Sequence, residues 1–433
     1  MRTAMTCVLA LVIAGGIGVA AFAQSDTIEY HPKFYDPVLE EMEAEGDSLE
    51  AIKDSITSTI RKRQKSEKEV AKETKRELRF DVSGIPAPES PDDFEAVFHF
   101  PPVRQYATGT CWSFSSTSFI ESEVYRQTGQ RIKLSEMHTV YYEYLRKARR
   151  YVRERGEGWN GQGSEANAVI TVMNEHGAVP LDVYTGLQPG VERHNHYHMS
   201  REIRNYLEYC KNHDYWDEDA VIDHVRLILN HYIGEPPTEF EYNGATYTPV
   251  AFVDQVLKLN LDDYVDVVST LSFPFYSYGP FEVRDNWWFD STYYNLPLSD
   301  FYRSVKAAIE QGYSVELGGD VSEPGWYGKQ DLSVVPDFDL PQEYINQDSR
   351  EFRFYNRTTG DDHGVHLVGY TEIDGRDWFL IKDSGSSARW GEHDGYSFMR
   401  DDYLRLKMLC YTVHRDVLES LLTQAEKPTL PEE

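Results

Sequence analysis

The sequence changes its periodicity once along the chain, and this change restricts the fold more than any other feature. Between residues 111 and 233, apolar and aromatic residues recur mostly at helical spacing, as in LSEMHTVYYEYLRKARRYVR (134–153). From residue 312 onward, short strand-like runs dominate, namely YSVELGG, GVHLVGYTEI, WFLIKDS, YSFM and LCYTV. Helices first and strands later predict an α+β protein rather than an alternating βαβ fold with a parallel sheet.

Several helix ends can be read directly from the sequence. Residues 111–128 predict a helix that Gly129 closes, because glycine readily adopts the left-handed conformation that ends a helix. The stretch NGQGSEANAVITVMNEHGAVP predicts a glycine turn followed by a helix that ends at Gly177 and Pro180. Residues 201–233 continue the helical pattern.

The first 95 residues differ from the rest. Residues 1–23 have one basic residue, an apolar centre and a small residue on each side of Phe22, which predicts a signal peptide cleaved after Ala23. Residues 24–95 predict a charged helical arm, with RKRQKSEKEVAKETKRELRF at 61–80, and then a Pro-rich linker or extended strap. A retained membrane anchor is the alternative for residues 1–23, and a prosegment or a partner-binding arm is the alternative for the charged stretch at 61–80. We expect a secreted or periplasmic protein whose main domain spans 96–433, with a helical insertion at about 190–300.

The charge balance excludes some partners. The chain carries 72 acidic and 43 basic residues, a formal net charge of -29. Nucleic acid and anionic membrane surfaces attract basic proteins, so we expect neither as a partner once the signal peptide is removed. Hydrophobic residues make up 40% of the chain, which is enough for a sizeable core.

Three cysteines remain after the predicted cleavage, namely Cys111, Cys210 and Cys410. An odd number in an oxidising compartment leaves at least one thiol free. Cys210 and Cys410 could form a disulfide, which leaves Cys111 as the candidate free thiol.

Cys111 stands where a reactive cysteine would need to be. The stretch TGTCW followed by a helix places Cys111 at a helix N-terminus, whose partial positive charge favours a thiolate. Far downstream, His363 precedes one predicted strand and Asp383 ends the next. A cysteine followed by a histidine and a carboxylate on neighbouring strands suits a thiol–imidazole pair that a third group orients. His366 is the rival for the base, and a buried structural cysteine is the alternative for Cys111.

Several motifs together resemble a known family. PVRQYATGTCWSFS is similar to the active-site stretch of papain-like cysteine peptidases, with Gln105 six residues before Cys111. HGVHLVGY resembles that family's His-strand, IKDS…RWGEHDGY resembles its Asn-strand, and LSE and NGQGSEAN follow in the family's order. Thr108 and the insertion LILNHYIGEPPTEFEY resemble the bleomycin hydrolase and aminopeptidase C branch.

The resemblance implies a two-lobed fold, with a helical lobe carrying Cys111, an antiparallel β lobe carrying His363, and a large helical insertion. It implies that Cys111 is the nucleophile, His363 the general base and Gln105 an oxyanion-hole donor. It also implies a peptide substrate, no metal or organic cofactor, and an assembly of six subunits. The implied substrate-binding and cleft-lining residues are Trp112, Gly161, Gly163, Gly364 and Asp320.

Three departures from the family pattern bear on activity. Asp383 replaces an asparagine, and its charge would favour the imidazolium form of His363. Gly385 replaces a tryptophan that shields the His hydrogen bond, for which Trp390 could substitute. The C-terminal EKPTLPEE is shorter than the tail that restricts the branch to trimming N-termini. Aminopeptidase or short-peptide action is therefore favoured, and endopeptidase action stays open.

Two further stretches could form a metal site or a contact surface. His194, His196 and His198 alternate and could bind a metal on a strand, but the surrounding residues predict a polar loop. DNWWFDSTYYN (285–295) could form a cleft wall or an oligomer contact, but its aromatic residues favour core packing.

The sequence thus favours a secreted cysteine peptidase in which Cys111, His363, Asp383 and Gln105 act together. The alternative is a catalytically impaired papain-like scaffold that binds peptides or a partner protein. A structural envelope protein with a buried Cys111 is a third hypothesis.

Overall fold

Residues 36–76 and 81–422 of the 433-residue chain are described by the computed structural model. The chain divides into two units, residues 1–77 and 78–433. The predicted signal peptide, its cleavage site after Ala23 and the terminal EKPTLPEE lie outside the described residues.

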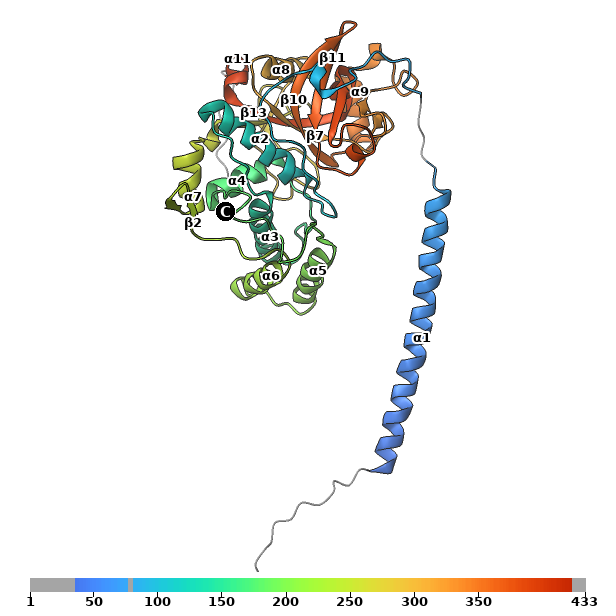
Figure 1. Ribbon diagram of the computed structural model, residues 1–433. Coiled ribbons are helices and arrows are strands. Elements are labelled where there is room, and N and C mark those ends of the chain that lie inside the picture. The colour runs from blue at the N-terminus through green and yellow to red at the C-terminus, as the bar shows by residue number, and fades with distance from the viewer. Residues whose placement is uncertain (1–35, 77–80, 423–433) are drawn as a thin grey trace, which may run out of the picture. The chain divides into compact units, whose positions relative to one another are not determined.

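The first unit contains one long helix, α1 (Pro37–Thr74), drawn in blue in Figure 1. The side chain of Asp36 caps its first turn by accepting from the backbone N–H of Val38 at 2.9 Å. Every side chain of α1 is exposed, its first turns are acidic, and both signs occur in its second half, where Arg63 and Glu67 lie one turn apart. The helix α1 lies within residues 24–95, the segment predicted as a charged helical arm and linker. Neither α1 nor any other helix among the described residues is long and apolar enough to cross a membrane.

The second unit begins with a group of helices. These are α2 (Cys111–Thr128), α3 (Glu136–Arg153), α4 (Ala166–His176), α5 (Tyr197–Asn212), α6 (Glu218–Ile233) and α7 (Pro249–Phe252). The helix α2 ends at Gly129 with φ 70°, and α4 ends at Gly177 with φ 71°, as the sequence predicts. Figure 1 shows α3, α5 and α6 gathered at one end of this unit and the main strands at the other.

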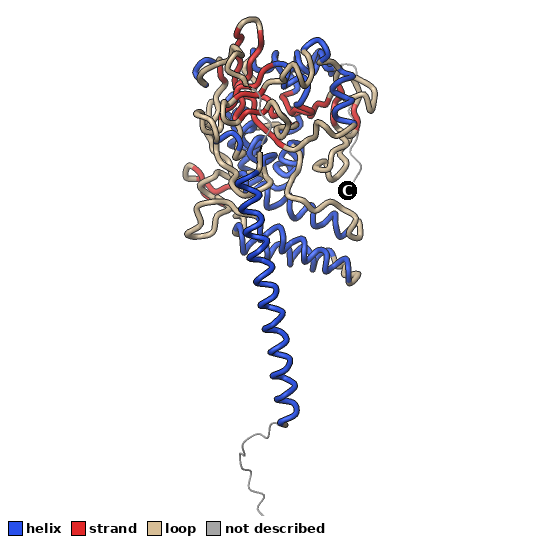
Figure 2. Tube along the Cα trace, turned by 90° about the vertical axis from the view of Figure 1, so that its right-hand side faces the viewer, coloured by secondary structure: helices blue, strands red, loops and turns tan. Residues whose placement is uncertain are grey.

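The main sheet is the second layer of this unit, and Figure 2 shows its strands in red. Its strands run in the order β5-β6-β4-β13-β7-β10-β11-β12-β9-β8, and β1 adds to β10. Their bounds are β1 (Glu95–Ala96), β4 (Tyr264–Val268), β5 (Tyr278–Gly279), β6 (Tyr293–Asn295), β7 (Val315–Gly319), β8 (Trp326–Tyr327), β9 (Leu332–Ser333), β10 (His363–Ile373), β11 (Arg376–Lys382), β12 (Tyr396–Arg400) and β13 (Met408–His414). The pairing is antiparallel except for two short parallel pairs, β4 with β6 and β9 with β12. The five strands predicted after residue 312 correspond to β7, β10, β11, β12 and β13.

Further helices cover the sheet. These are α8 (Leu298–Glu310), α9 (Gln347–Tyr355), α10 (Asp401–Lys407) and α11 (Glu419–Leu422). The amphipathic α8 buries Phe301, Val305 and Ala308 in a core that includes Leu317 of β7 and Leu367 of β10. Burial of this apolar face holds β7 and β10 in place from one side.

The helix α2 lies between the helices and the sheet. Its side chains are buried from Trp112 to Val124, and many of them are serines and threonines. Small side chains allow neighbouring elements to approach closely, and Ser115 donates across the gap to Glu316 of β7 at 2.7 Å. This packing places the first residue of α2 next to the strands that carry the histidine.

Two predicted segment boundaries change in the structure. The stretch predicted as a helical insertion at about 190–300 also contains strands. A hairpin of β2 (Phe240–Tyr242) and β3 (Ala245–Tyr247) interrupts its helices, and β4 and β6 join the main sheet. The Pro-rich segment before residue 96 packs with the second unit, since Val82 and Phe94 are buried against Trp378 and other sheet residues. It is thus a strap across the sheet rather than a linker.

The suggested disulfide between Cys210 and Cys410 is not formed. All three cysteines within the described residues are free thiols. Cys210 is buried among the helices by α5, whereas Cys410 is buried on β13 in a different apolar cluster. The two thiols belong to separate cores and cannot bridge.

Candidate active site

Cys111 is the first residue of α2, an 18-residue helix, and it is partly exposed. The helix dipole directs partial positive charge toward its side chain. Thr110 does not cap the helix with its side chain, because its hydroxyl pairs instead with that of Thr108 at 2.7 Å. The position is the one that the sequence predicts for a reactive thiol.

His363 begins β10, and Asp383 directly follows the neighbouring antiparallel strand β11. Nε2 of His363 lies 2.6 Å from Oδ1 of Asp383. Burial by itself lowers the pKa of His363, but the charges of Asp383 and Cys111 and hydrogen bonds to both outweigh it, so the pKa lies well above its ordinary value. Because Nε2 is taken by Asp383, Nδ1 is the nitrogen left to interact with Cys111. The three residues predicted to form the catalytic group are thus brought together.

Asp383 is fully buried and ionised. Burial raises the pKa of its carboxyl, but His363, the backbone N–H of Gly385 and the charge of Arg389 together hold that pKa below its ordinary value. The Gly385 N–H donates to Oδ1 at 2.7 Å, and the Arg389 guanidinium donates to the Asp383 carbonyl at 3.1 Å. The short distance, the raised pKa of His363 and the lowered pKa of Asp383 all indicate an ion pair between Asp383 and the imidazolium of His363.

Gly364 explains how β10 comes so close to α2. A Cβ at this position would lie 2.7 Å from Oγ of Ser115, 3.1 Å from Oε1 of Glu316 and 3.4 Å from Cα of Trp112. Only glycine therefore fits without a shift of the strand or the helix. Gly364 lets the backbone of His363 approach the start of α2, and its predicted role in substrate binding stays a prediction.

Gln105 is fixed beside the catalytic group by hydrogen bonds on both sides of its amide. Its Nε2 donates to the carbonyl of Thr108 at 2.8 Å, and its Oε1 accepts from Ser384 at 2.7 Å. Its backbone N–H also donates to the Ser384 carbonyl at 3.1 Å. Since Ser384 follows Asp383, one short segment orients both the histidine and the predicted oxyanion-hole donor.

Trp112 and the glycines of the 159–163 loop also lie near the start of α2. The indole N–H of the buried Trp112 donates to the Gln162 carbonyl at 3.1 Å, and the side chain of Gln162 accepts from the Gly109 N–H at 3.0 Å. The carbonyls of Gly161 and Gly163 both accept from the buried ammonium of Lys147. These contacts attach the loop to the cysteine helix, while its contact with substrate stays a prediction.

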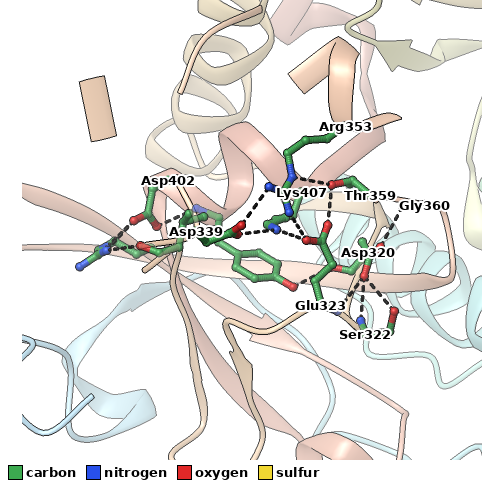
Figure 3. Close-up of polar contacts among 12 residues, drawn as sticks. Asp320, Ser322, Glu323, Asp339, Arg353, Thr359, Gly360, Asp402 and Lys407 are labelled. Atoms are coloured by element: carbon green, nitrogen blue, oxygen red, sulfur yellow. Dashed lines mark hydrogen bonds and ion pairs between the residues drawn. The ribbon is translucent and has the colours of Figure 1, made fainter. Parts of the chain in front are cut away.

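Asp320 has a structural role that the sequence did not indicate. It was expected to line the cleft, but it is buried and accepts from the backbone N–H groups of Ser322, Glu323 and Gly360. Figure 3 shows these contacts beside a second network in which Glu323 binds Lys407 and Arg353. Together the two networks anchor the segment that leads into His363.

The other histidines singled out by sequence do not join the site. His366 is fully buried, its ring pairs with Ser118 at 2.8 Å, and burial holds its pKa well below its ordinary value. It is therefore a core residue and not the base. His196 is buried as the residue before α5, whereas His198 is exposed, so the alternating histidines do not face one common site.

An open cavity of about 570 Å³ lies beside Gly385. Its lining includes Arg104, Arg193 and Arg389. Trp390 also lines it and is 53% exposed, so it is not buried over the His363–Asp383 bond as the missing tryptophan would be. A Cβ on Gly385 would lie only 3.1 Å from the imidazole ring, so the backbone itself covers that bond.

The aromatic segment 285–295, for which core packing was favoured over a cleft wall or an oligomer contact, is mostly buried. Trp287 is buried and donates to Glu143 of α3 at 2.6 Å, and Tyr293 is buried in β6. Phe289 between them is 74% exposed. Core packing accounts for most of this segment, as the sequence favoured.

Two buried titratable side chains near the site were missed by the sequence analysis. Glu316 in β7 accepts from Ser115, and burial raises its pKa to about 8. Lys147 in α3 holds the glycine loop. The glutamate stands inside the apolar run YSVELGG, and an acidic residue in a predicted buried strand could have indicated a site. Lys147 lies in a helix with many other basic residues, so nothing in the sequence separates it from them.

The fold is similar to that of solved cysteine peptidases. PepW from Lactobacillus rhamnosis, of the bleomycin hydrolase and aminopeptidase C family, aligns over 87% of this chain and 93% of its own, with a TM-score of 0.63 and 16% sequence identity. A mite allergen from a study of Blo t 1 and Der p 1 aligns less well, with a TM-score of 0.38 and 14% sequence identity over 78% of this chain and 74% of its own. Procathepsin L 3 of Tenebrio molitor larval midgut aligns with a TM-score of 0.35 and 15% sequence identity over 78% of this chain and 73% of its own. No protein-family profile and no curated protein matches the chain by sequence. The chain therefore has the papain-like cysteine peptidase fold that its motifs predicted.

Proposed function

We propose that this chain is a secreted cysteine peptidase that hydrolyses short peptides through Cys111 and His363. The observation that carries the proposal is the buried ion pair of His363 and Asp383 beside a thiol at a helix N-terminus. A raised imidazole pKa keeps the ring protonated, and a protonated ring stabilises the thiolate that peptide cleavage requires. The similarity to PepW supports the same class of chemistry.

In the first half of the reaction, the Cys111 thiolate attacks the peptide carbonyl and a carbon–sulfur bond forms. The carbonyl oxygen becomes an oxyanion, toward which the Cys111 N–H and the second amide hydrogen of Gln105 would donate. The imidazolium of His363 gives its proton to the leaving nitrogen, and the carbon–nitrogen bond breaks. A thioester and a free amine result.

In the second half, water attacks the thioester while the neutral imidazole of His363 takes one of its protons. The carbon–sulfur bond breaks, the acid leaves, and the thiolate and imidazolium are restored. Asp383 holds the ring in one orientation throughout and stabilises its charge. The hydroxyl of Ser384, the residue after Asp383, donates to the side chain of Gln105 and so keeps Gln105 close to this pair.

The cavity beside Gly385 favours short peptides. Its three arginines stand out in a chain with a net charge of -29, and arginine recognises carboxylates with good geometry. Arg104 pairs with Asp394 at 3.5 Å, and the buried guanidinium of Arg389 contacts Asp394 at 3.2 Å and the Asp383 carbonyl at 3.1 Å, so the exposed Arg193 is the arginine best placed to meet a ligand. A peptide that ends within this cavity would present its terminal carboxylate to the arginines.

Location and assembly belong to the proposal as well. The N-terminal 23 residues support secretion or a periplasmic location. The hexamer implied by family resemblance remains a proposal that size-exclusion chromatography with light scattering of the mature protein would test.

The test of the function is alkylation of the mature protein by iodoacetamide across a pH series, with Cys111 followed by mass spectrometry. Fast labelling well below about pH 8.5, the ordinary ionisation point of a thiol, supports a thiolate held by His363. The variant C111A should then lose all hydrolysis of aminoacyl and blocked peptide substrates. Slow labelling at all but alkaline pH, with no hydrolysis, would favour the alternative of a scaffold that binds peptides without cleaving them.

A further inference from the structure

The helix α1 carries a continuous apolar stripe along one face. Six apolar residues recur at spacings of three, four or seven positions, which places them in one narrow band of the helix surface. They are Val38, Met42, Leu49, Ile52, Ile56 and Ile60, and each is between 41% and 62% exposed. Val70 continues the same band and is 57% exposed. An exposed apolar band of this extent is typical of an interaction surface.

A long helix with an uncovered stripe lacks its main source of stability. The helix α1 has 38 residues, so it is about 57 Å long at 1.5 Å per residue. In proteins most helical stability comes from packing of the apolar face, and intrinsic propensity contributes less. Gly46 and the run of serine, threonine and isoleucine at 55–60 lower the propensity of α1 further. The helix therefore needs a surface that covers its stripe.

The stripe follows a heptad repeat with two rows of seam positions. One row is Met42, Leu49, Ile56, Arg63 and Val70, and the other row is Val38, Glu45, Ile52, Thr59 and Ser66. Rows of this kind form the seam along which two helices wind around each other. Each row contains one charged residue, Glu45 or Arg63, and a charge in a seam needs an opposite charge across from it. The occupant that fits the stripe is thus a second helix with the same repeat and complementary charges.

A second copy of α1 that runs in the opposite direction meets this requirement. In an antiparallel pair, each row of one helix faces the other row of its partner. When Ile52 of one copy lies opposite Ile56 of the other, the same register places Val38 opposite Val70 and Glu45 opposite Arg63. The two-fold symmetry of such a dimer makes each of these pairs occur twice. Both seam charges are then paired, and the apolar positions face the centre of the pair.

A parallel pair of α1 helices would set like charges against each other. In register, Glu45 would face Glu45 and Arg63 would face Arg63 of the second copy, which disfavours that arrangement. The two halves of the helix discriminate in the same way. Residues 37–55 contain seven acidic residues and one basic residue, whereas residues 56–74 contain six basic and three acidic residues. Only the antiparallel arrangement brings each acidic half against a basic half.

We propose that α1 binds α1 of a second copy of this chain in an antiparallel coiled coil, with Glu45 of each copy paired with Arg63 of the other. Within one copy Arg63 contacts Glu67 at 3.5 Å, an exposed ion pair that contributes little, so this contact does not prevent the pairing with Glu45. The inference concerns the first unit and does not depend on the proposed peptidase function. It is also separate from the six-subunit assembly, which rests on motifs that follow α1 in the sequence.

The first experiment measures self-association of the chain from residue 24 onward by sedimentation equilibrium across a dilution series. The variants are Glu45→Arg, Arg63→Glu and E45R/R63E, all of which exchange good helix formers. Glu43→Arg is the matched control, since it makes the same charge change at a position off the seam. We expect E45R and R63E each to raise the dimer dissociation constant by about tenfold or more, because like charges then face each other. The double variant E45R/R63E should return to within about threefold of the wild type.

Two results of this experiment would overturn the proposal. Equal association of the wild type, E45R and R63E would mean that this face of α1 does not bind a second copy, and another kind of partner would then have to cover it. A double variant that associates no better than the single variants would contradict the pairing of Glu45 with Arg63. E43R measures the effect of total charge, so a loss as large as that in E45R would also count against the seam.

Disulfide trapping tests the direction of the two helices. The chains V38C and V70C are prepared in the C111A background, in which the remaining cysteines, Cys210 and Cys410, are buried. Each chain is oxidised alone and in a mixture, and linked peptides are identified by mass spectrometry. We expect a disulfide between the V38C and V70C chains in the mixture and none when either chain is alone. Disulfides in each chain alone, or no disulfide in the mixture, would overturn the antiparallel pair. S58C, on the opposite face of α1, is the control and should not be trapped with V38C.

Discussion

The carboxylate of Asp383 lies 2.6 Å from Nε2 of His363, and the Gly385 N–H donates to the same oxygen at 2.7 Å. An asparagine at this place could orient the ring, but only a carboxylate adds a charge that favours the imidazolium. The pKa of His363 is raised, so its contribution to stability is complete below about pH 6.5 and is lost as pH rises through the raised value. The pKa of Asp383 is lowered, so its contribution is present above about pH 3.9 and is lost as pH falls through the lowered value.

Replacing Asp383 by asparagine should narrow the pH range of activity from the alkaline side. Without the carboxylate, the imidazolium of His363 loses its main electrostatic support and deprotonates at lower pH. We expect the alkaline limb of the kcat/KM profile to move down by about one unit or more in D383N. The control is D374N, the same change at an exposed aspartate in the turn between β10 and β11. An alkaline limb at the wild-type position in D383N would mean that this charge does not govern the active protonation state.

Gly385 should tolerate no side chain without a loss of rate. A Cβ there would lie 3.1 Å from Cε1 and Nε2 of His363 and 3.2 Å from Oδ1 of Asp383. We expect G385A to displace the imidazole by a few tenths of an ångström and to lower kcat by about tenfold, with little change in Tm. Stopped assays and calorimetry on G385A and on S386A, its neighbour, measure both quantities. Wild-type kcat in G385A would show that the ring is not held as tightly as the contact distances imply.

Much of the fold could be predicted because local chemistry agrees with the final structure. Gly129 ends α2 in the left-handed conformation, which glycine adopts at low cost, and the apolar runs after residue 312 became strands. The strands β4 and β6 were missed, since YVDVV and YYN are short and lie between helical and aromatic stretches. Only their partners in the sheet decide their conformation.

The candidate site could be predicted only in part. Cys111, His363 and Asp383 were found because each stands at the end of a recognisable helix or strand. The contact of Ser115 with Glu316 could not be predicted, because two residues far apart in the sequence meet only when α2 packs against β7. Whether Cys210 and Cys410 pair could not be predicted for the same reason, since sequence does not give the distance between elements, and the structure shows both as free thiols.

A methyl group on Gly364 should separate the two lobes at the catalytic pair. Its Cβ would clash with Oγ of Ser115 at 2.7 Å and press on Glu316 of β7. We expect G364A to lose about 1–3 kcal/mol of unfolding free energy and most of its activity, because β10 must move away from α2. Denaturant unfolding and kcat/KM measure the two effects.

The double variant G364A/S115G tests the cause of that loss. Removing the Ser115 side chain takes away the closest contact, so part of both the stability and the activity should return. The single variant S115G is the control, since it also loses the hydrogen bond to Glu316. Losses in G364A and S115G that simply add in the double variant would show that this contact is not what limits Gly364.

A terminal carboxylate should improve substrates whose end reaches the cavity beside Gly385. Arg193 is exposed there, and its guanidinium lies 5.9 Å from the ring centre of Tyr106, so it can turn toward a carboxylate. We expect amidation of the C-terminus of a tripeptide to lower kcat/KM by about fivefold in the wild type and by less in R193Q. R201Q, an arginine on α5 that does not line the cavity, is the control and should keep the wild-type ratio. Equal hydrolysis of free and amidated tripeptides by the wild type would mean that the arginines do not select short peptides, and longer substrates would then be the ones to assay.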